Sequence, residues 1–207
     1  MSFHATKVFN TFEGGAIVCP DKKTKERVDY LKNFGFADET TVVAPGINGK
    51  MNELQAAVGL AQLPRVTVEM LQRKTIYETY VSALEGLPGI TYMKVRENVS
   101  WNWSYFPILI DSDKYGIERD ELYFRLKEKG VFARRYFYPL ISDFPMYRAC
   151  HGASTCSSAA DMSRKVICLP MYAHLTEVDQ AKIIRCLYDL SPAKVRDSRI
   201  EVMGKKS

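Results

Sequence analysis

The sequence has no long hydrophobic run, no internal repeat and no recognisable leader. Its apolar stretches are far shorter than the ~18 residues that a membrane-spanning helix needs, so a transmembrane protein is not expected. The first residues, Met1–Lys7, lack a basic start followed by an apolar block, and we therefore expect a cytoplasmic protein without a signal peptide. No similarity recurs at a fixed period, which argues against solenoid and propeller folds.

Cysteine pairs of the kind that bind zinc or build a disulfide framework are also missing. Five cysteines are present, an odd number, and no Cys-x-x-Cys pair occurs among them. Cys150, His151 and Cys156 lie near one another in the sequence, but their spacing fits no common zinc pattern. The sequence therefore predicts reduced thiols and no metal site.

A strong charge of one sign is absent as well. Lys and Arg number 29 against 24 Asp and Glu, which gives a net charge of +5. The two signs stand side by side within the predicted helices, as in Lys25-Glu26-Arg27, and interspersed charges make no strong field. We therefore expect no nucleic-acid partner, although residues 194–206 are locally basic.

The composition that remains is that of an ordinary globular protein. Of the 207 residues, 46% are hydrophobic and 26% are charged, which excludes disordered and low-complexity classes. This length suits one large domain, or one domain and part of another.

Hydrophobic spacing predicts short elements at the start of the chain and long helices after them. The pattern predicts, in order, a buried strand over residues 16–19, a surface helix over 22–34, a loop after 42–44, and helical segments over 51–63 and 66–84. Pro64 separates the two long segments. Because proline has no amide hydrogen to donate and clashes with the preceding turn, we expect a kink there.

The pattern changes to mixed strands and helices after Gly89. The expected elements are strands over residues 90–95 and 105–110, a helix over 118–129, a strand over 131–138, and helices over 157–166 and from Thr176 onward. The last helix opens with Thr176-Glu177-Val178-Asp179, which has the Thr-x-x-acid form of a helix start. From Ser191 the pattern is lost, and we expect a loose tail.

Lys7 is the first candidate for chemistry. Apolar and aromatic residues flank it on both sides: Phe3, Val8, Phe9 and Phe12. They predict a partly buried lysine, and burial favours the neutral amine that forms a Schiff base. Ser2 and Thr6 offer hydroxyls suited to a phosphate. Gly14-Gly15 either permits a close approach of the backbone or makes a turn, and the sequence leaves both interpretations open.

A second candidate is the glycine loop in front of the helix predicted from Met51. The segment Gly46-Ile47-Asn48-Gly49-Lys50 carries an amide and a lysine at this position. A helix N-terminus presents free amide hydrogens and a positive end, both of which favour an anion. An ordinary capped helix would have the same pattern, so this segment alone does not decide between the two.

Together these segments resemble the DegT/DnrJ/StrS family of nucleotide-sugar aminotransferases, which use pyridoxal phosphate on a fold-type-I scaffold. The matching segments, in order along the chain, are Ser2–Lys7, Glu13–Ala16, Gly46–Met51, Glu53–Leu60, Arg135–Leu140 and Leu169–Tyr172. The resemblance spans residues 1–190, and no single motif carries it.

The resemblance implies an α/β fold, namely the C-terminal part of a fold-type-I pyridoxal-phosphate-dependent aminotransferase. The expected parts are the end of the large cofactor domain with the Schiff-base lysine (1–63), a long kinked linking helix (64–86), a small α/β domain (87–190) and a tail (191–207). Family members run to roughly twice this length. Their first half supplies the aspartate for the pyridine nitrogen, the stacking ring and most of the phosphate loop, so we expect this partial chain to be inactive alone.

The resemblance also assigns roles to residues of the cofactor site. Lys7 would be the catalytic lysine that binds pyridoxal 5'-phosphate, and Ser2 would hydrogen-bond the phosphate of the same cofactor. Asn48 would reach the phosphate of the neighbouring subunit's cofactor, which implies a homodimer with residues 34–63 at its interface. His4, beside the lysine, is expected to be structural.

Further residues would contact the substrate. Lys50 stands where the family usually has Arg, so its contact with an anionic substrate is weakened or altered, because Lys cannot bind phosphate bidentately. Arg135, Tyr136 and Tyr138 would approach the substrate, or they pack within a half-buried strand. The implied reaction transfers an amino group from an amino acid, expected to be glutamate, to a nucleotide-linked keto-deoxysugar, as in lipopolysaccharide O-antigen synthesis.

Two functions remain open from the sequence. The chain is either an aminotransferase of partial extent, or a non-catalytic remnant of the fold that acts as an interaction or oligomerisation fragment. Binding of the cofactor distinguishes them, because only the first needs Lys7 to react.

Overall fold

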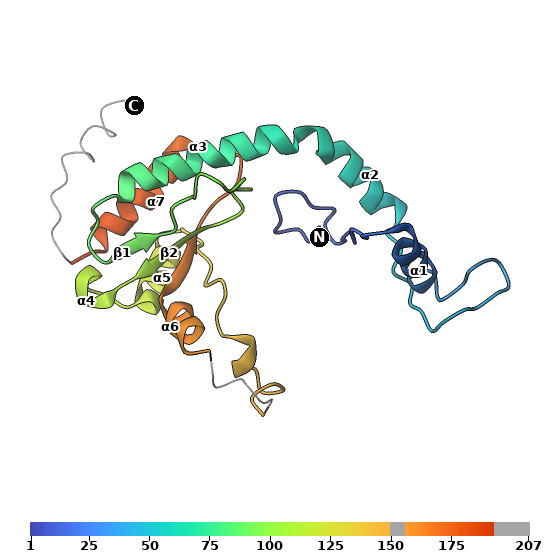
Figure 1. Cartoon of the computed structure of the whole chain (residues 1–207). Coiled ribbons are helices and arrows are strands. Elements are labelled where there is room, and N and C mark those ends of the chain that lie inside the picture. Colours follow the sequence, from blue (N-terminus) through green and yellow to red (C-terminus); the bar gives the residue numbers. More distant parts are fainter. Residues whose placement is uncertain (150–155, 193–207) are drawn as a thin grey trace. The chain divides into compact units, whose positions relative to one another are not determined.

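A computed structural model describes residues 1–149 and 156–192, and the chain divides into two compact units (Figure 1). The first unit is Met1–Glu69 and the second is Met70–Ser207. The division falls inside a long helix, α3, which spans Val66–Leu84. Helices combine with a β-sheet, which confirms the predicted α/β class. The predicted tail lies outside the described residues from residue 193 on.

The first helix, α1, spans Lys22–Lys32 and is a surface helix, as predicted. Asp21 caps its first turn, because a side-chain oxygen of Asp21 accepts a hydrogen bond from the Thr24 backbone N–H at 2.7 Å. None of its residues is fully buried. The helix ends two residues earlier than predicted, and Gly35, with a left-handed φ of 88°, then turns the chain.

The second helix, α2, spans Glu53–Gln62. It begins two residues later than predicted, because Asn52 and Gln55 form a capping box in which each side chain accepts the other residue's backbone N–H. The kink predicted at Pro64 is confirmed: a short 3-10 turn, η1 (Leu63–Arg65), separates α2 from α3.

The prediction of a buried strand over residues 16–19 is wrong. Ile17 and Val18 are 71% and 79% exposed. A strand needs a neighbouring strand to satisfy its backbone N–H and C=O groups, and apolar sequence alone does not supply one. Here the neighbour is the first residue of the chain, where the Ala16 N–H donates to the Met1 carbonyl at 3.1 Å.

The second unit contains a three-stranded antiparallel sheet in the order β1-β2-β3. Its strands are β1 (Ile90–Tyr92), β2 (Phe106–Ile110) and β3 (Val166–Leu169). The first two were predicted, and β1 is shorter than expected. The third was not predicted, because the sequence pattern indicated a helix over residues 157–166 and no strand after it.

Helices accompany this sheet in the described part of the second unit. They are α4 (Ser112–Tyr115), α5 (Arg119–Glu128), η2 (Ile141–Asp143), α6 (Ser157–Lys165) and α7 (Glu177–Asp189). All but the short α4 and η2 match predicted helices. Helices α3 and α7 lie beside one another (Figure 1), and the Gln180 side-chain amide donates to the Ile76 carbonyl between them at 2.7 Å. Among the described residues no helix is long and apolar enough to cross a membrane.

The core of the second unit is built on the alternating side chains of β2. Phe106, Ile108 and Ile110 are almost fully buried and pack with residues of α3, α5 and α7. Tyr115 is also fully buried, and its hydroxyl donates to the Leu187 carbonyl at 2.6 Å. Because a buried hydroxyl without a partner is costly, this hydrogen bond lets the large ring enter the core.

The strand predicted over residues 131–138 is wrong. Its backbone pairs with β3 at a single bridge, where Arg134 and Cys168 exchange two hydrogen bonds of 3.0 and 2.7 Å. The chain then turns at Tyr136 and Phe137. Apolar and aromatic residues made the segment resemble a strand, but it pairs with β3 only at the bridge between Arg134 and Cys168.

The first sixteen residues form a closed loop that packs on α2. The Phe3 N–H donates to the Gly14 carbonyl, and the Thr11 N–H donates to the Phe3 carbonyl, each at 2.9 Å. Thr11 is 1% exposed and lies against Gly59 of α2. A Cβ atom at Gly59 would come within 2.9 Å of Thr11 Cγ2 and 3.6 Å of Phe9 Cζ, so only glycine permits this approach.

We expect Gly59→Ala to destabilise the protein. In an ordinary helix position alanine is favoured over glycine by about 1 kcal/mol. Here the methyl group would collide with Thr11, whose hydroxyl is tied to the Glu13 carbonyl at 2.7 Å, so we expect a net loss of about 1–3 kcal/mol. Urea denaturation measures it, with Ala57→Ser at an exposed position of the same helix as control. A stabilised Gly59→Ala protein would contradict the packing described above.

Candidate active site

Lys7 belongs to the closed loop whose two ends are joined by the hydrogen bond between the Phe3 N–H and the Gly14 carbonyl. Its backbone N–H donates to the His4 carbonyl at 2.9 Å, which makes a tight turn at residues 4–7. The lysine is partly buried, and Val8 beside it is only 9% exposed. The loop therefore presents the lysine from a turn whose flanks are held by backbone hydrogen bonds and by packing on α2.

The residues around Lys7 form a small polar network. Ser2 Oγ accepts a hydrogen bond from the His4 N–H at 3.4 Å. The His4 ring lies between Thr6 Oγ1, 3.0 Å from Nδ1, and Glu13 Oε1, 3.5 Å from Nε2. These contacts support a structural role for His4, because it joins the two sides of the loop. Ser2 stays exposed at the start of the loop and keeps the donor capacity of its hydroxyl.

Gly14 favours a close approach of the backbone over a turn into a strand, because the described residues 16–19 after it form no strand. Its φ of +148° lies in a region that residues with side chains rarely adopt. A Cβ there would also lie 2.5 Å from Thr11 Oγ1 and 3.0 Å from Met51 Cε. Met51 directly follows Lys50, so the second candidate segment approaches the lysine loop through this methionine.

The segment that carries Asn48 is fixed to the C-terminal end of α1. The Ile47 and Gly49 N–H groups donate to the carbonyls of Leu31 and Lys32, each at 2.8 Å. These carbonyls belong to the last turn of the helix, where intrahelical donors run out. Asn48 is exposed and is held through its backbone, so its side chain is presented outward rather than used in the fold.

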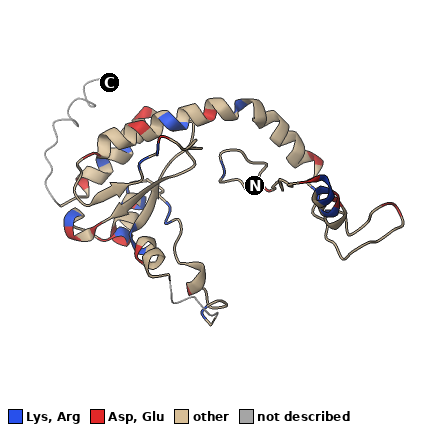
Figure 2. Cartoon of the chain, in the orientation of Figure 1, with Lys and Arg blue, Asp and Glu red and all other residues tan. Residues whose placement is uncertain are grey.

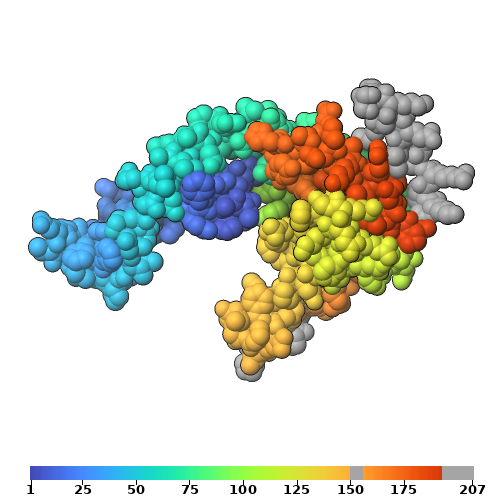
Figure 3. Space-filling model, turned by 180° about the vertical axis from the view of Figure 1, so that it is seen from behind, coloured from blue at the N-terminus to red at the C-terminus, as the bar shows by residue number. Residues whose placement is uncertain are grey.

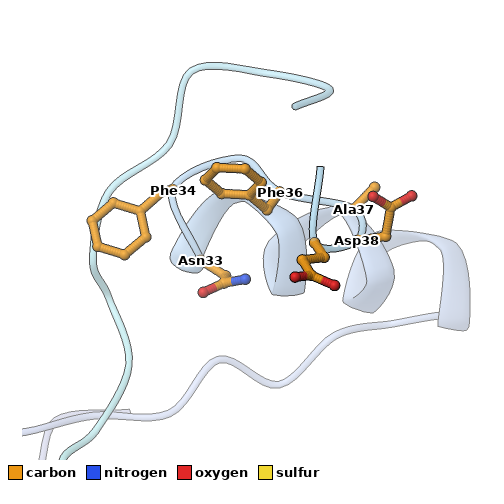
Figure 4. Close-up of a pocket in the computed structure, with 6 residues that line it drawn as sticks. Asn33, Phe34, Phe36, Ala37 and Asp38 are labelled. Atoms are coloured by element: carbon orange, nitrogen blue, oxygen red, sulfur yellow. The ribbon is translucent and has the colours of Figure 1, made fainter. Parts of the chain in front are cut away.

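Lys50 is engaged by residues just beyond α1. Its ammonium group donates to Asn33 Oδ1 at 2.7 Å and lies 4.6 Å from the centre of the Phe34 ring. Asn33 and Phe34 also line a hollow of about 370 Å³ together with residues 36–39, as Figure 4 shows. The backbone N–H groups of Thr40 and Thr41 hold the pKa of Asp38 in this hollow below its usual range. The hollow therefore carries a stable negative charge, which disfavours an anionic ligand.

The remaining predicted residues lie in the second unit, after the single bridge at Arg134. The Tyr136 ring meets the Tyr105 ring edge-on, with centroids 5.6 Å apart. Tyr138 is 43% exposed. The chain continues past them into residues 141–149, which form a protruding lobe of this unit (Figure 3, golden).

Arg135 is held by a carboxylate that the sequence did not single out. Its Nη1 atom donates to Asp120 Oδ1 at 2.9 Å, and its guanidinium lies 4.4 Å from the centre of the Tyr123 ring. Arg135 and Tyr138 also approach one another, at 5.7 Å. Asp120 gave no sequence signal, because it stands among the charged residues of a surface helix and contacts Arg135 only in the folded chain.

The lysine loop fits one part of a pyridoxal phosphate site. Lys7 offers an amine for the aldehyde of the cofactor, and Ser2 offers a hydroxyl for its phosphate. Asn48 and Lys50 form a separate group beside α1, with the amide exposed and the ammonium already hydrogen-bonded. In the described ranges, no group of three or more His, Cys, Asp or Glu residues could hold a metal ion; Cys150 and His151 lie outside those ranges.

Comparisons with known proteins agree with this arrangement of motifs. The model of the DegT/DnrJ/EryC1/StrS aminotransferase family matches residues 1–188. A dTDP-4-amino-4,6-dideoxy-D-glucose transaminase of Escherichia coli is 51% identical over 181 residues, which cover 85% of this chain and 48% of the relative. The protein of the same name from Shigella dysenteriae is 47% identical over 176 residues. The chain thus spans about half the length of the curated relatives it matches.

Solved structures share the fold over the same extent. The structure of DesI in the presence of its TDP-sugar product has a TM-score of 0.84 and 29% identity, covering 98% of this chain and 50% of DesI. DesV of S. venezuelae, in complex with a ketimine intermediate, has a TM-score of 0.83 and 25% identity, covering 92% of this chain and 50% of DesV. These matches confirm the predicted fold class, and the chain belongs to the DegT/DnrJ/EryC1/StrS aminotransferase family.

Proposed function

We propose that this chain is part of a pyridoxal-phosphate-dependent aminotransferase that acts on a nucleotide-linked keto-deoxysugar, with glutamate as the amino donor. The observation that carries the proposal is Lys7, a partly buried lysine at the end of a closed loop, in a chain of this family. The names of the relatives support the substrate class: a dideoxyglucose transaminase at 51% identity and DesI with its TDP-sugar product.

In this proposal each residue of the loop has a separate task. Bound pyridoxal phosphate supplies an electron sink that lets a C–H bond of the amino acid break. Lys7 holds the cofactor and then takes up and releases the proton at its Nζ atom, as a general base and acid. The Ser2 hydroxyl donates to the cofactor phosphate. The packing of Thr11 against Gly59 supports the loop that carries both groups.

Candidate substrate-binding residues occur in each of the two units. Lys50 offers a point charge with two remaining N–H donors to an anionic group, since one donor is used by Asn33. Arg135 offers a planar guanidinium, and Tyr136 and Tyr138 offer rings and hydroxyls. Asn48 would contribute to the cofactor of a second subunit.

Covalent attachment of the cofactor is the direct test of Lys7. After the chain is incubated with pyridoxal phosphate and reduced with borohydride, we expect peptide mapping to find the pyridoxyl group on Lys7, because its loop presents a partly buried amine beside the Ser2 hydroxyl. Lys7→Arg keeps the positive charge but should remove the label. Labelling that is spread equally over surface lysines, or that survives Lys7→Arg, would refute this role.

We expect the 207-residue chain by itself to lack multiple-turnover transamination. The described residues supply one amine, one hydroxyl and the Asn48 segment, whereas the matched relatives are about twice as long. Enzymes lower barriers by ~8–23 kcal/mol, and a loosely held cofactor without stacking or a proton-holding carboxylate loses most of that. The measurement is transfer from glutamate to a nucleotide-linked keto-sugar with added cofactor. A rate that disappears in Lys7→Ala would show this expectation to be wrong.

We also propose that the chain forms a homodimer through residues 34–63. Apolar side chains in this segment are strongly exposed, at 50–72% for the following: Phe34, Ile47, Leu54, Leu60 and Leu63. Monomeric proteins rarely expose many large apolar side chains in one segment, so a second copy is the expected cover. The same exposure favours the alternative function, a non-catalytic fragment that acts through oligomerisation.

Sedimentation velocity at micromolar concentration should therefore give a dimer. The double substitution Leu54→Glu/Leu60→Glu should shift it to a monomer, because two buried carboxylates per subunit would oppose the interface. Val178→Glu, at a 79% exposed position of α7, is the matched control and should leave the dimer intact. A monomeric wild-type chain would rule the dimer out.

The proposed reaction is placed in the cytoplasm, with no membrane or nucleic-acid partner. Cys19, Cys156, Cys168 and Cys186 are free thiols, which suits a reducing compartment. Figure 2 shows basic and acidic residues interspersed along helices of each unit, and interspersed charges make no strong field for a nucleic acid.

A further inference from the structure

Asp120 joins two arginines through one oxygen atom. Its Oδ1 lies 2.8 Å from Arg119 Nε and 2.9 Å from Arg135 Nη1. The contact with Arg135 has hydrogen-bond geometry, whereas Arg119 Nε is buried and its contact is an ion pair without hydrogen-bond alignment. One carboxylate thus holds two guanidinium groups close together and offsets the repulsion between them.

Arg119 is a fixed support rather than a surface charge. It is 3% exposed, and its Nη1 atom donates to the carbonyls of Ser163 and Val166 at 3.0 and 2.9 Å. Both carbonyls belong to the C-terminal end of α6, where the helix dipole favours a cation. Burial lowers the pKa of Arg119, and Asp120 opposes that shift, so the buried cation and its carboxylate depend on one another.

Asp120 and Arg119 hold the segment that follows Arg134 at two points. Arg135 is tied to Asp120, and its guanidinium lies on the Tyr123 ring. Three residues later, the Tyr138 ring lies on Arg119, with the guanidinium carbon 4.7 Å from the ring centre. Between these points the segment has no strand pairing in the described structure. Its conformation therefore depends on side chains from the first turn of α5.

We propose that Arg119 and Asp120 are positioning residues that set the guanidinium of Arg135 and the ring of Tyr138 for the anionic, nucleotide-linked substrate. This rests on the proposed function only for the identity of the ligand, because the coupling between the two residue pairs is a property of the chain itself. Asp120 acts through its negative charge and by accepting a hydrogen bond from Arg135. Asp120→Asn keeps an acceptor but removes the charge, so it should preserve part of the effect, whereas Asp120→Ala should abolish it.

The first experiment measures the coupling without any ligand. In the 207-residue chain, the side-chain Nε–H signal of Arg135 and the ring signals of Tyr138 are assigned by NMR with Arg135→Lys and Tyr138→Phe. We expect Asp120→Ala to shift and broaden the Arg135 signal, Asp120→Asn to shift it less, and Arg119→Lys to move the Tyr138 signals. Glu121→Ala is the matched control, because Glu121 is the next residue of α5 and pairs with Arg125 instead.

The second experiment adds thymidine diphosphate as the ligand probe. Loss of the hydrogen bond that orients a charged group should weaken binding about tenfold in Asp120→Ala. Asp120→Asn should bind more tightly than Asp120→Ala but less tightly than wild type, and Glu121→Ala should stay near wild type. Thermal unfolding of each variant shows whether the unit stays folded, and Asp120→Asn provides the comparison if Asp120→Ala does not.

The outcomes distinguish the positioning role of Asp120 from the proposed contact with a nucleotide-linked substrate. If Asp120→Ala leaves the Arg135 signal unchanged, or binds the probe as tightly as wild type, the positioning role is overturned. If Asp120→Asn behaves like Asp120→Ala, acceptance of the hydrogen bond is not its basis and the proposal fails equally. If no variant and no wild-type chain binds thymidine diphosphate while the NMR shifts occur as expected, the proposed substrate contact fails and the positioning role holds.

Discussion

The close approach of Thr11 to Gly59 determines where Lys7 lies. Thr11 is buried and its side chain is tied to the backbone of its own loop, so it cannot move aside for a larger residue in α2. The missing side chain at residue 59 lets the loop rest directly on the helix. Backbone hydrogen bonds within the loop connect Thr11 to Phe3 and close the turn at Lys7, so the contact with α2 also fixes the position of the lysine. A catalytic amine on an irregular loop needs such support, because an unsupported loop would lose the orientation that makes catalysis efficient.

The second unit solves the same problem with charge instead of close packing. Its candidate substrate segment is also irregular, and after the bridge at Arg134 it has no ladder of backbone hydrogen bonds to hold it. Asp120 and Arg119, from the first turn of α5, hold the segment instead, through Arg135 and Tyr138. A buried arginine is costly unless it is hydrogen-bonded, and here the end of α6 supplies two carbonyls. The site residues of both units are thus held by contacts that lie far from them in the sequence.

Helices could be predicted from this sequence much better than strands, for a physical reason. A helix satisfies its backbone within one segment and marks its own start, as the capping box at Asn52 and the cap at Thr176 do. A strand depends on a partner elsewhere in the chain. Residues 16–19 and 131–138 had the apolar pattern of strands but not the partners, whereas β3 had partners without a recognisable pattern. The motif around Lys7 was visible because its residues are neighbours in the sequence, and Asp120 was not, because it meets Arg135 only after folding.

At residue 50 this chain has a lysine where the family usually has an arginine, and the two residues bind anions differently. An arginine there would present a planar fork that binds an anionic group through two parallel hydrogen bonds. The lysine instead donates one hydrogen bond to Asn33 and packs on the Phe34 ring. Both contacts hold it near the end of α1. Its ammonium still carries a full charge, but the direction of that charge is set by the fold rather than by a ligand. Under the proposed function, Arg135 is therefore better suited than Lys50 to bind a phosphate, because its guanidinium keeps N–H groups that Asp120 does not use beside the exposed Tyr138 ring.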